Sequence, residues 1–110
     1  MRLKSIEISN FRNIDKMILD FNKNVNIFIG KNAQGKTSIL ESIYVLAFTK
    51  SCKSITEDEL IKRDKAFFKL KGTFKIGNFN RKLEIGYRKG EKRLKYNNKS
   101  VVRVSDYVFS

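Results

Sequence analysis

Alternating apolar and polar residues run through the first part of the chain, and this period of two predicts β-strands. We expect a first strand over residues 2–8 and a second over residues 17–21, joined by a polar connection at residues 9–15. Residues 25–29, Val-Asn-Ile-Phe-Ile, form a short apolar run that is typical of a buried strand. The third expected strand leads directly into a glycine-bounded loop.

The pattern changes to a helical period after this loop. Apolar residues recur there at the spacing of one helix face, namely Ile39, Leu40, Ile43, Leu46 and Ala47. This spacing predicts a helix over residues 36–48, followed by a polar, basic loop at residues 49–54. Thr56 and Glu59 then fit a capping box, which predicts a short helix ending near residue 61.

The second half of the chain returns to a period of two. The pattern predicts strands over residues 68–76, 83–88, 94–96 and 99–101, with turns at residues 77–80, 89–91 and 97–98. Asn97 and Asn98 suit a two-residue hairpin loop because Asn tolerates positive φ. Residues 105–109 fit the beginning of a further element. The predicted fold class is α/β, a strand–loop–helix unit followed by an antiparallel meander at about residues 66–102.

The loop before the helix carries the pattern Gly-x-x-x-x-Gly-Lys-[Ser/Thr] at residues 30–37. Its glycines let backbone N–H groups wrap around an anion, and the N-terminus of the following helix adds a favourable dipole. In this pattern Lys36 reaches the β- and γ-phosphates of a nucleoside triphosphate, and the Thr37 hydroxyl binds Mg²⁺. We expect the phosphate site to comprise Gly30, Lys31, Asn32, Ala33, Gln34, Gly35, Lys36, Thr37 and Ser38. The alternative is a glycine turn that binds nothing.

The charge of the chain favours polyanionic partners. Its 110 residues, about one domain in size, include 24 Lys and Arg against 11 Asp and Glu, which gives a net charge of +13. Lysine-rich chains also arise from an AT-rich genome or from a solvated surface. Composition alone therefore leaves nucleic-acid binding open.

Several other classes of protein are excluded by the sequence. No segment approaches the roughly 18 apolar residues that span a bilayer, and Arg2 and Lys4 lead into a strand instead of a signal peptide. The single cysteine, Cys52, cannot form an internal disulfide, and without any His it cannot build a zinc site. This cysteine usage fits a reducing cytoplasm, with Cys52 as an incidental thiol.

Nucleoside triphosphatases that carry this phosphate-binding loop also use an apolar strand that ends in Asp or Asp-Glu for hydrolysis. Residues 101–106 do not fit it, because Arg103 interrupts the apolar run. No carboxylate is a candidate catalytic base. We therefore expect residues 1–110 to be the N-terminal portion of a longer protein. This portion alone should bind ATP but hydrolyse it poorly. A complete small binding domain is the alternative.

Three segments together resemble the RecF family of bacterial recombination mediators, relatives of the structural-maintenance-of-chromosomes ATPases. The first is the pattern Leu-x-x-Ile-x-Ile-x-x-Phe-Arg-Asn at residues 3–13, and the second is Asn-Ala-Gln-Gly-Lys-Thr at residues 32–37. The third is Lys-Ser-Cys-Lys-Ser at residues 50–54, where Lys53 replaces the usual Arg and loses its planar fork. The family's coiled-coil arm, signature motif and acidic strand have no counterpart in the chain.

The resemblance implies an ABC/SMC-type ATPase head that binds ATP and Mg²⁺, dimerises with ATP between two heads and binds DNA when ATP is bound. It further implies slow hydrolysis in the full-length dimer, work with RecO and RecR to load RecA at single-strand gaps, and support of replication, repair and the SOS response. By resemblance, Arg12 and Asn13 flank the nucleotide, and Gln34 contacts the γ-phosphate or the partner head. For Arg12 and Asn13 the alternative is a solvated turn, and for Gln34 it is a surface loop residue.

Candidate DNA contacts are Lys53 and the basic strand faces, with Lys69, Lys71, Lys75, Arg81, Lys82 and Arg88. A solvated strand face is the alternative for these residues. Two other functions also fit the sequence: another head-type ATPase, linked to a nuclease or a transporter, and a basic nucleic-acid-binding module without catalysis. Transporter subunits usually carry Asn-Gly in the loop and do not begin with Phe-Arg-Asn.

Overall fold

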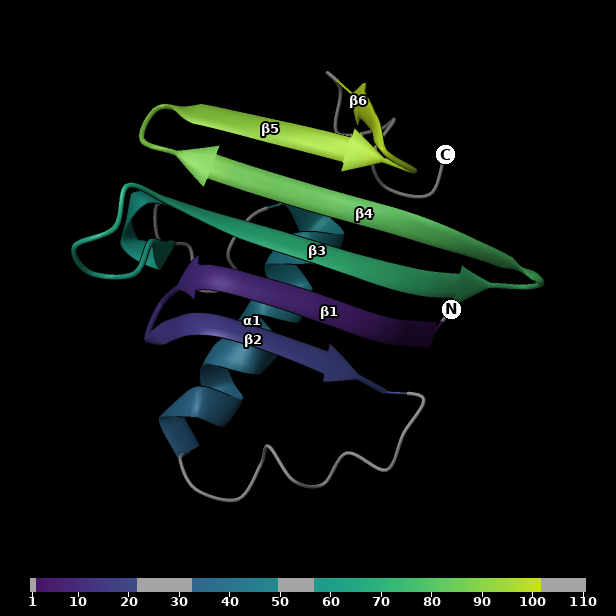
Figure 1. Cartoon of the computed structure of the whole chain (residues 1–110), viewed down its shortest axis with the longest axis horizontal. Helices are drawn as coiled ribbons and strands as arrows, with labels where there is room; N and C mark the ends of the chain where they lie inside the picture. The colour runs from purple at the N-terminus through teal and green to yellow at the C-terminus, as the bar shows by residue number, and fades with distance from the viewer. Residues whose placement is uncertain (1, 22–32, 50–56, 102–110) are drawn as a thin grey trace.

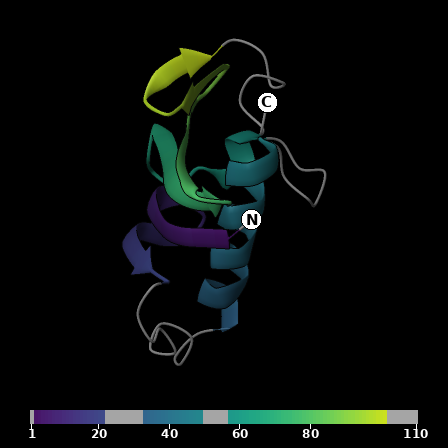
Figure 2. The same ribbon diagram turned by 90° about the vertical axis from the view of Figure 1, so that its right-hand side faces the viewer.

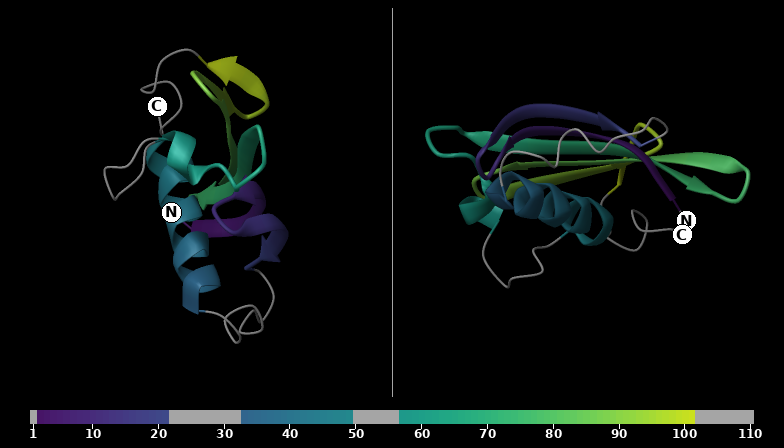
Figure 3. Two further views of the ribbon diagram at one scale, coloured as in Figure 1. Left: turned by 90° about the vertical axis from the view of Figure 1, so that its left-hand side faces the viewer. Right: turned by 90° about the horizontal axis from the view of Figure 1, so that it is seen from below.

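The computed structural model describes residues 2–21, 33–49 and 57–101, with only the backbone given for residues 33–36, 57 and 76. The described chain forms one antiparallel sheet with a single long helix lying across one of its faces (Figure 1). Side views show this two-layer arrangement, with the helix on one side only (Figures 2 and 3). The molecule measures 37 × 36 × 21 Å, and two packed layers account for the short dimension.

The elements follow the chain in a simple order. They are β1 (Arg2–Phe11), β2 (Ile14–Asp20), α1 (Ala33–Phe48), the 3₁₀ helix η2 (Glu57–Leu60), β3 (Phe67–Ile76), β4 (Phe79–Arg88), β5 (Glu91–Tyr96) and β6 (Lys99–Val101). The strand order in the sheet is β2-β1-β3-β4-β5-β6. The N-terminal hairpin therefore joins the meander through the pairing of β1 with β3, in which Ile8 lies opposite Leu70.

The hydrophobic core lies between the sheet and α1. Buried residues alternate with more exposed ones along β1, β3 and β4, so these strands turn one side toward the helix. On the helix, Ile39, Val45 and Leu46 complete the same cluster. Phe11 packs edge-on against Phe68, with ring centroids 5.3 Å apart and an interplanar angle of 85°. Burial of these faces supplies the main stabilising free energy.

The predicted fold class and most of the predicted elements are confirmed. Buried Phe68, Leu70 and Phe74 alternate along β3 with exposed lysines, as the sequence pattern requires. Asn97 and Asn98 have φ of 51° and 69°, so they form the expected hairpin loop. The Asn97 side chain also accepts a hydrogen bond from the Lys82 backbone N–H at 2.8 Å.

Several predicted boundaries were wrong, including the start of β5, which is Glu91 and not residue 94. The connection predicted at residues 9–15 is a tight turn at Arg12 and Asn13, because both Phe11 and Ile14 reach the core and extend their strands toward it. The helix begins at Ala33, earlier than residue 36, and β4 begins at Phe79, inside the predicted turn at residues 77–80. The predicted short helix is present as a 3₁₀ turn that ends at Leu60, close to the expected end, and Ile61 forms a bridge with Phe11.

Several sequence predictions lie outside the described residues. They concern the strand at residues 25–29, the loop at residues 49–54 beyond Thr49, the cap at Thr56 and the element at residues 105–109. The assignment of residues 1–110 to the N-terminal portion of a longer head stays a prediction. Among the described residues, no helix is long and apolar enough to cross a membrane.

Candidate functional site

The start of α1 is the part of the phosphate-loop pattern that the structure describes. Gly30, Lys31 and Asn32 lie outside the described residues, and for Ala33, Gln34, Gly35 and Lys36 only the helical backbone is described. No acidic residue occurs in the first turn of α1. The positive end of the helix dipole therefore meets no competing carboxylate from its own first turn, which is the electrostatic condition for anion binding.

The two hydroxyl residues that follow Lys36 have different environments. Thr37 is exposed, whereas Ser38 is buried at 8% exposure. The Ser38 hydroxyl donates a hydrogen bond to Oδ1 of Asn13 at 2.9 Å. This bond places the turn between β1 and β2 beside the residue that directly follows the loop pattern.

A second contact joins the same turn to the next turn of α1. The Arg12 guanidinium donates from Nε to Oε1 of Glu41 at 2.7 Å and from Nη2 to Oε2 at 3.1 Å. The Glu41 side chain is only 3% exposed and that of Arg12 is 29% exposed. Two parallel charge-assisted hydrogen bonds fix the plane of the guanidinium as well as its position.

The backbone of the turn is held from the opposite direction by the segment after η2. The Arg12 N–H donates to the Leu60 carbonyl at 2.7 Å, and the Lys62 N–H donates to the Asn10 carbonyl at 2.8 Å. Asn10 and Arg12 both have a φ of 56°, an unfavourable value for residues with a Cβ. The turn at residues 10–13 is thus clamped between α1 and the segment at residues 60–62, and it is not merely a solvated loop.

The candidate DNA-contacting residues are not all brought together. The strand register places Lys69, Lys71 and Arg88 on the face of the sheet opposite α1, here called the outer face. Arg81 lies opposite buried Phe74, on the helix side, and its guanidinium stacks over Phe79 at 5.3 Å from the ring centroid. Lys53 lies outside the described residues.

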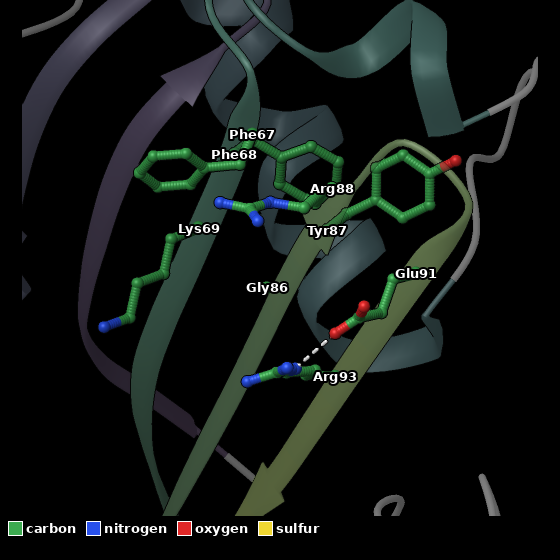
Figure 4. Close-up of a pocket in the computed structure, with 8 residues that line it drawn as sticks. All are labelled: Phe67, Phe68, Lys69, Gly86, Tyr87, Arg88, Glu91 and Arg93. Atoms are coloured by element: carbon green, nitrogen blue, oxygen red, sulfur yellow. Dashed lines mark hydrogen bonds and ion pairs between the residues drawn. The ribbon is translucent and has the colours of Figure 1, made fainter.

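The outer face contains a hollow over Gly86. The register puts Lys69 and Arg93 on either side of this glycine, and Phe67 and Arg88 lie at one end (Figure 4). Some of this charge is already paired: Lys69 lies 3.7 Å from Glu84, and Arg93 lies 2.6 Å from Glu91. Within the described ranges, no group of His, Cys, Asp and Glu has the arrangement of a metal site.

The N-terminal strands, the glycine-bounded loop pattern and the helix that follows it belong to a known class of ATPase domain. The chain belongs to the AAA ATPase domain family, whose model matches residues 1–104.

Individual relatives agree with the resemblance to RecF. The chain is 38% identical over 110 residues to the DNA replication and repair protein RecF of Oceanobacillus iheyensis, covering 100% of this chain and 30% of that protein. It is 39% identical over 108 residues to the protein of the same name from Bacillus cereus strain G9842, covering 98% of this chain and 29% of the relative. The chain thus spans about 30% of the length of these relatives.

Solved structures show the same relationship in three dimensions. A structure of the recombination mediator protein RecF-ATP in the RecFOR pathway matches with a TM-score of 0.81 and 34% identity, over 94% of this chain and 28% of that one. A second RecF structure from the same pathway matches with a TM-score of 0.81 and 31% identity, over 96% of this chain and 29% of that one. The similarity to RecF, and with it the predicted type of ATPase head, is confirmed.

Sequence reasoning missed the role of Glu41. It lies between Ile39 and Ser42, among the buried positions of α1, and it is itself only 4% exposed. A carboxylate on the buried side of an amphipathic helix implies a cationic partner, since an unpaired buried charge is strongly unfavourable. That signal was present in the sequence, but the partner could not be identified because Arg12 lies 29 positions away.

Proposed function

We propose that the chain is the nucleotide-binding part of a RecF-type ATPase head, and that it binds ATP with Mg²⁺ through residues 30–38. The single observation that carries the proposal is the junction of two chain segments at the start of α1. There the phosphate-loop pattern runs into a helix N-terminus, and Asn13 is hydrogen-bonded to Ser38 directly after it. The similarity to RecF-ATP supports ATP as the ligand.

The residues of the proposed site divide into groups with different tasks. The backbone N–H groups of residues 30–36, including those of Gly30, Lys31, Asn32, Ala33, Gln34 and Gly35, surround the phosphates. Lys36 neutralises the β- and γ-phosphates, and Thr37, which is exposed, provides a hydroxyl ligand for Mg²⁺. Gln34 contacts the γ-phosphate or a partner head. Arg12 and Asn13 complete the site from the β1–β2 turn.

Magnesium and ATP fit the described residues chemically. Oxygen ligands such as a Thr hydroxyl suit Mg²⁺, which keeps most of its waters and binds phosphate oxygens. The helix N-terminus and the chain's net charge of +13 suit a polyphosphate. Bound Mg²⁺ would neutralise phosphate charge, and the residues of this chain would hold and orient the triphosphate.

The wider role follows from the same proposal. Full-length relatives are named DNA replication and repair proteins, so we infer an ATP-dependent DNA-binding switch in recombinational repair, located in the cytoplasm. RecO, RecR and a second ATP-bound copy of the full-length protein are its proposed partners, and RecA loading at gaps, replication and the SOS response are its proposed context. Anisotropy of labelled gapped DNA, with and without ATP, tests the DNA part directly.

Replacing the loop lysine tests nucleotide binding. Lys36→Ala should weaken binding of a fluorescent ATP analogue by at least about 100-fold, because a charged phosphate contact is lost in a partly desolvated site. The measurement is a fluorescence titration in the presence of Mg²⁺. Lys16→Ala, which removes the same charge from exposed β2, is the matched control and should bind normally. Equal affinities of the two variants would show that the loop does not bind the nucleotide.

A further inference from the structure

Glu41 is a buried carboxylate whose two oxygens both accept hydrogen bonds from one guanidinium. Its side chain is 3% exposed, and Arg12 contacts it at 2.7 and 3.1 Å. A carboxylate at this depth is tolerated when its charge and its lone pairs are satisfied together. The pair therefore restrains the position of the Arg12 side chain.

The helix spacing shows that the contact is part of a two-point attachment. Ser38 and Glu41 are three residues apart and share one face of α1. They engage two consecutive residues of the β1–β2 turn, Asn13 and Arg12 respectively. Attachments at two consecutive turns of the helix restrain both the distance and the register of the β1–β2 turn relative to α1.

The backbone of the β1–β2 turn cannot easily adjust if this attachment is lost. The turn is hydrogen-bonded on its other side to Leu60 and Lys62, and two of its residues have left-handed backbone angles. Such angles persist when several contacts with the surrounding structure fix them. The side-chain bonds to α1 add a restraint on the direction of the Arg12 guanidinium.

We propose that Glu41 is a positioning residue for nucleotide binding: it holds the Arg12 guanidinium against α1, about two turns beyond the start of the helix, and so strengthens binding of the triphosphate. The inference rests on the proposed ATP site. Glu41 touches no phosphate itself and acts through Arg12. Loss of the two Glu41 bonds should leave the Arg12 guanidinium less ordered, and ordering it again when the nucleotide binds should weaken binding.

The test compares two substitutions on the buried side of α1. Glu41→Gln keeps the size of the side chain but removes the charge that holds both guanidinium nitrogens. Ser42→Ala is the matched control, since Ser42 is 0% exposed and its hydroxyl donates only to the Ile39 carbonyl of the same helix among the contacts described, at 2.6 Å. Both variants perturb the packing of α1, but only the first loosens Arg12.

The measurements are titration with a fluorescent ATP analogue and Mg²⁺, and thermal unfolding of the same 110-residue chain. We expect Glu41→Gln to bind the analogue about threefold to tenfold more weakly, the range that corresponds to ordering one long side chain. Ser42→Ala should keep the wild-type affinity even if it melts earlier. Wild-type affinity in Glu41→Gln would overturn the positioning role and leave a purely structural ion pair.

Variants in the β1–β2 turn keep the proposal testable if Glu41→Gln fails to fold. Arg12→Lys retains the positive charge but loses the planar fork, and Asn13→Ala removes the bond to Ser38 from an exposed position. Both should weaken nucleotide binding, and Glu41→Gln should add little to the loss caused by Arg12→Ala. Full additivity, or turn variants that bind normally, would contradict the proposal.

The inference and the proposed function fail in distinguishable ways. If the wild-type chain binds the analogue and Lys36→Ala does not, the site is established whatever Glu41 does. If Lys36→Ala binds as well as wild type, the site itself is misplaced, and Glu41 has no nucleotide to serve.

Discussion

Gly72 is a residue at which the helix closely approaches the sheet. It lies on the helix side of β3, where a Cβ would come within 2.5 Å of Leu46 Cδ2 and 3.2 Å of the Ser5 carbonyl oxygen. Leu46 is fully buried, so its side chain has little room to move aside. Packing therefore favours a glycine at this position, whereas its φ is not in the left-handed region.

Adding one methyl group at Gly72 should therefore be costly. Gly72→Ala is expected to lower the free energy of unfolding by about 1–3 kcal/mol, the usual effect of overpacking a core. Gly86→Ala is the matched control on β4, because no atom lies within 4 Å of the added Cβ there. The control should be neutral or stabilising by about 0.4–1 kcal/mol, since Ala restricts the unfolded chain. Urea denaturation of both variants measures the difference, and equal stabilities would contradict the close approach.

The C-terminal end of α1 is completed by a residue from a distant strand. Thr49 follows the helix with a φ of 65°, and the helix has no basic residue in its last turn. Lys92 of β5 supplies the missing charge, with its ammonium donating to the Thr49 carbonyl at 2.8 Å. A cation at this end interacts favourably with the helix dipole and satisfies a carbonyl that has no partner within the helix.

Removal of that cation should loosen the end of the helix. Lys92→Met is expected to lower the free energy of unfolding by about 0.5–1 kcal/mol, and the loss should shrink at high salt. Lys89→Met removes an equal charge from the neighbouring turn and should change stability much less. Thermal unfolding at low and high ionic strength measures both. A loss that persists at high salt would point to packing of the aliphatic stem instead.

The sequence predicted the helices and strands better than it predicted the contacts between them. Period-two and helical patterns located α1 and every described strand, because burial of one face leaves a local signal. The length of β1 and β2 was underestimated, since left-handed angles at Asn10 and Arg12 are not readable from residue type. The same limit applies to the site: Arg12 and Asn13 were named by family resemblance, but their bonds to Glu41 and Ser38 are long-range contacts without a local pattern.

At the level of the molecule, positive charge is concentrated on the outer face of the sheet. Cationic residues there come from four strands and include Lys16, Lys69, Lys71, Lys75, Lys82, Arg88, Arg93 and Lys95. In the described part of the chain no helix covers this face (Figure 3). A basic sheet face is suited to the phosphates of a nucleic acid, which binds with a strong salt dependence.

A matched pair of double variants separates this surface from the overall charge. Lys71→Gln with Arg88→Gln removes two cations from the outer face, whereas Arg81→Gln with Lys99→Gln removes two from positions on the helix side of the register. We expect the first pair to weaken DNA binding more and to reduce the slope of log affinity against log salt by about 1–2. Fluorescence anisotropy over a salt series measures both. Equal losses would assign DNA binding to net charge alone.

The pairing of β1 with β3 also constrains when the protein can fold. Arg2 pairs with Lys75, and α1 lies between the two strands in the sequence. The meander from β3 to β6 is made of neighbouring hairpins and can close quickly, whereas the N-terminal hairpin has to wait for a partner that leaves the ribosome much later. During synthesis the edge of β1 that will bind β3 is therefore exposed, together with the apolar side of α1. This interval is when the nascent chain is most prone to aggregation, and when a chaperone would protect it most.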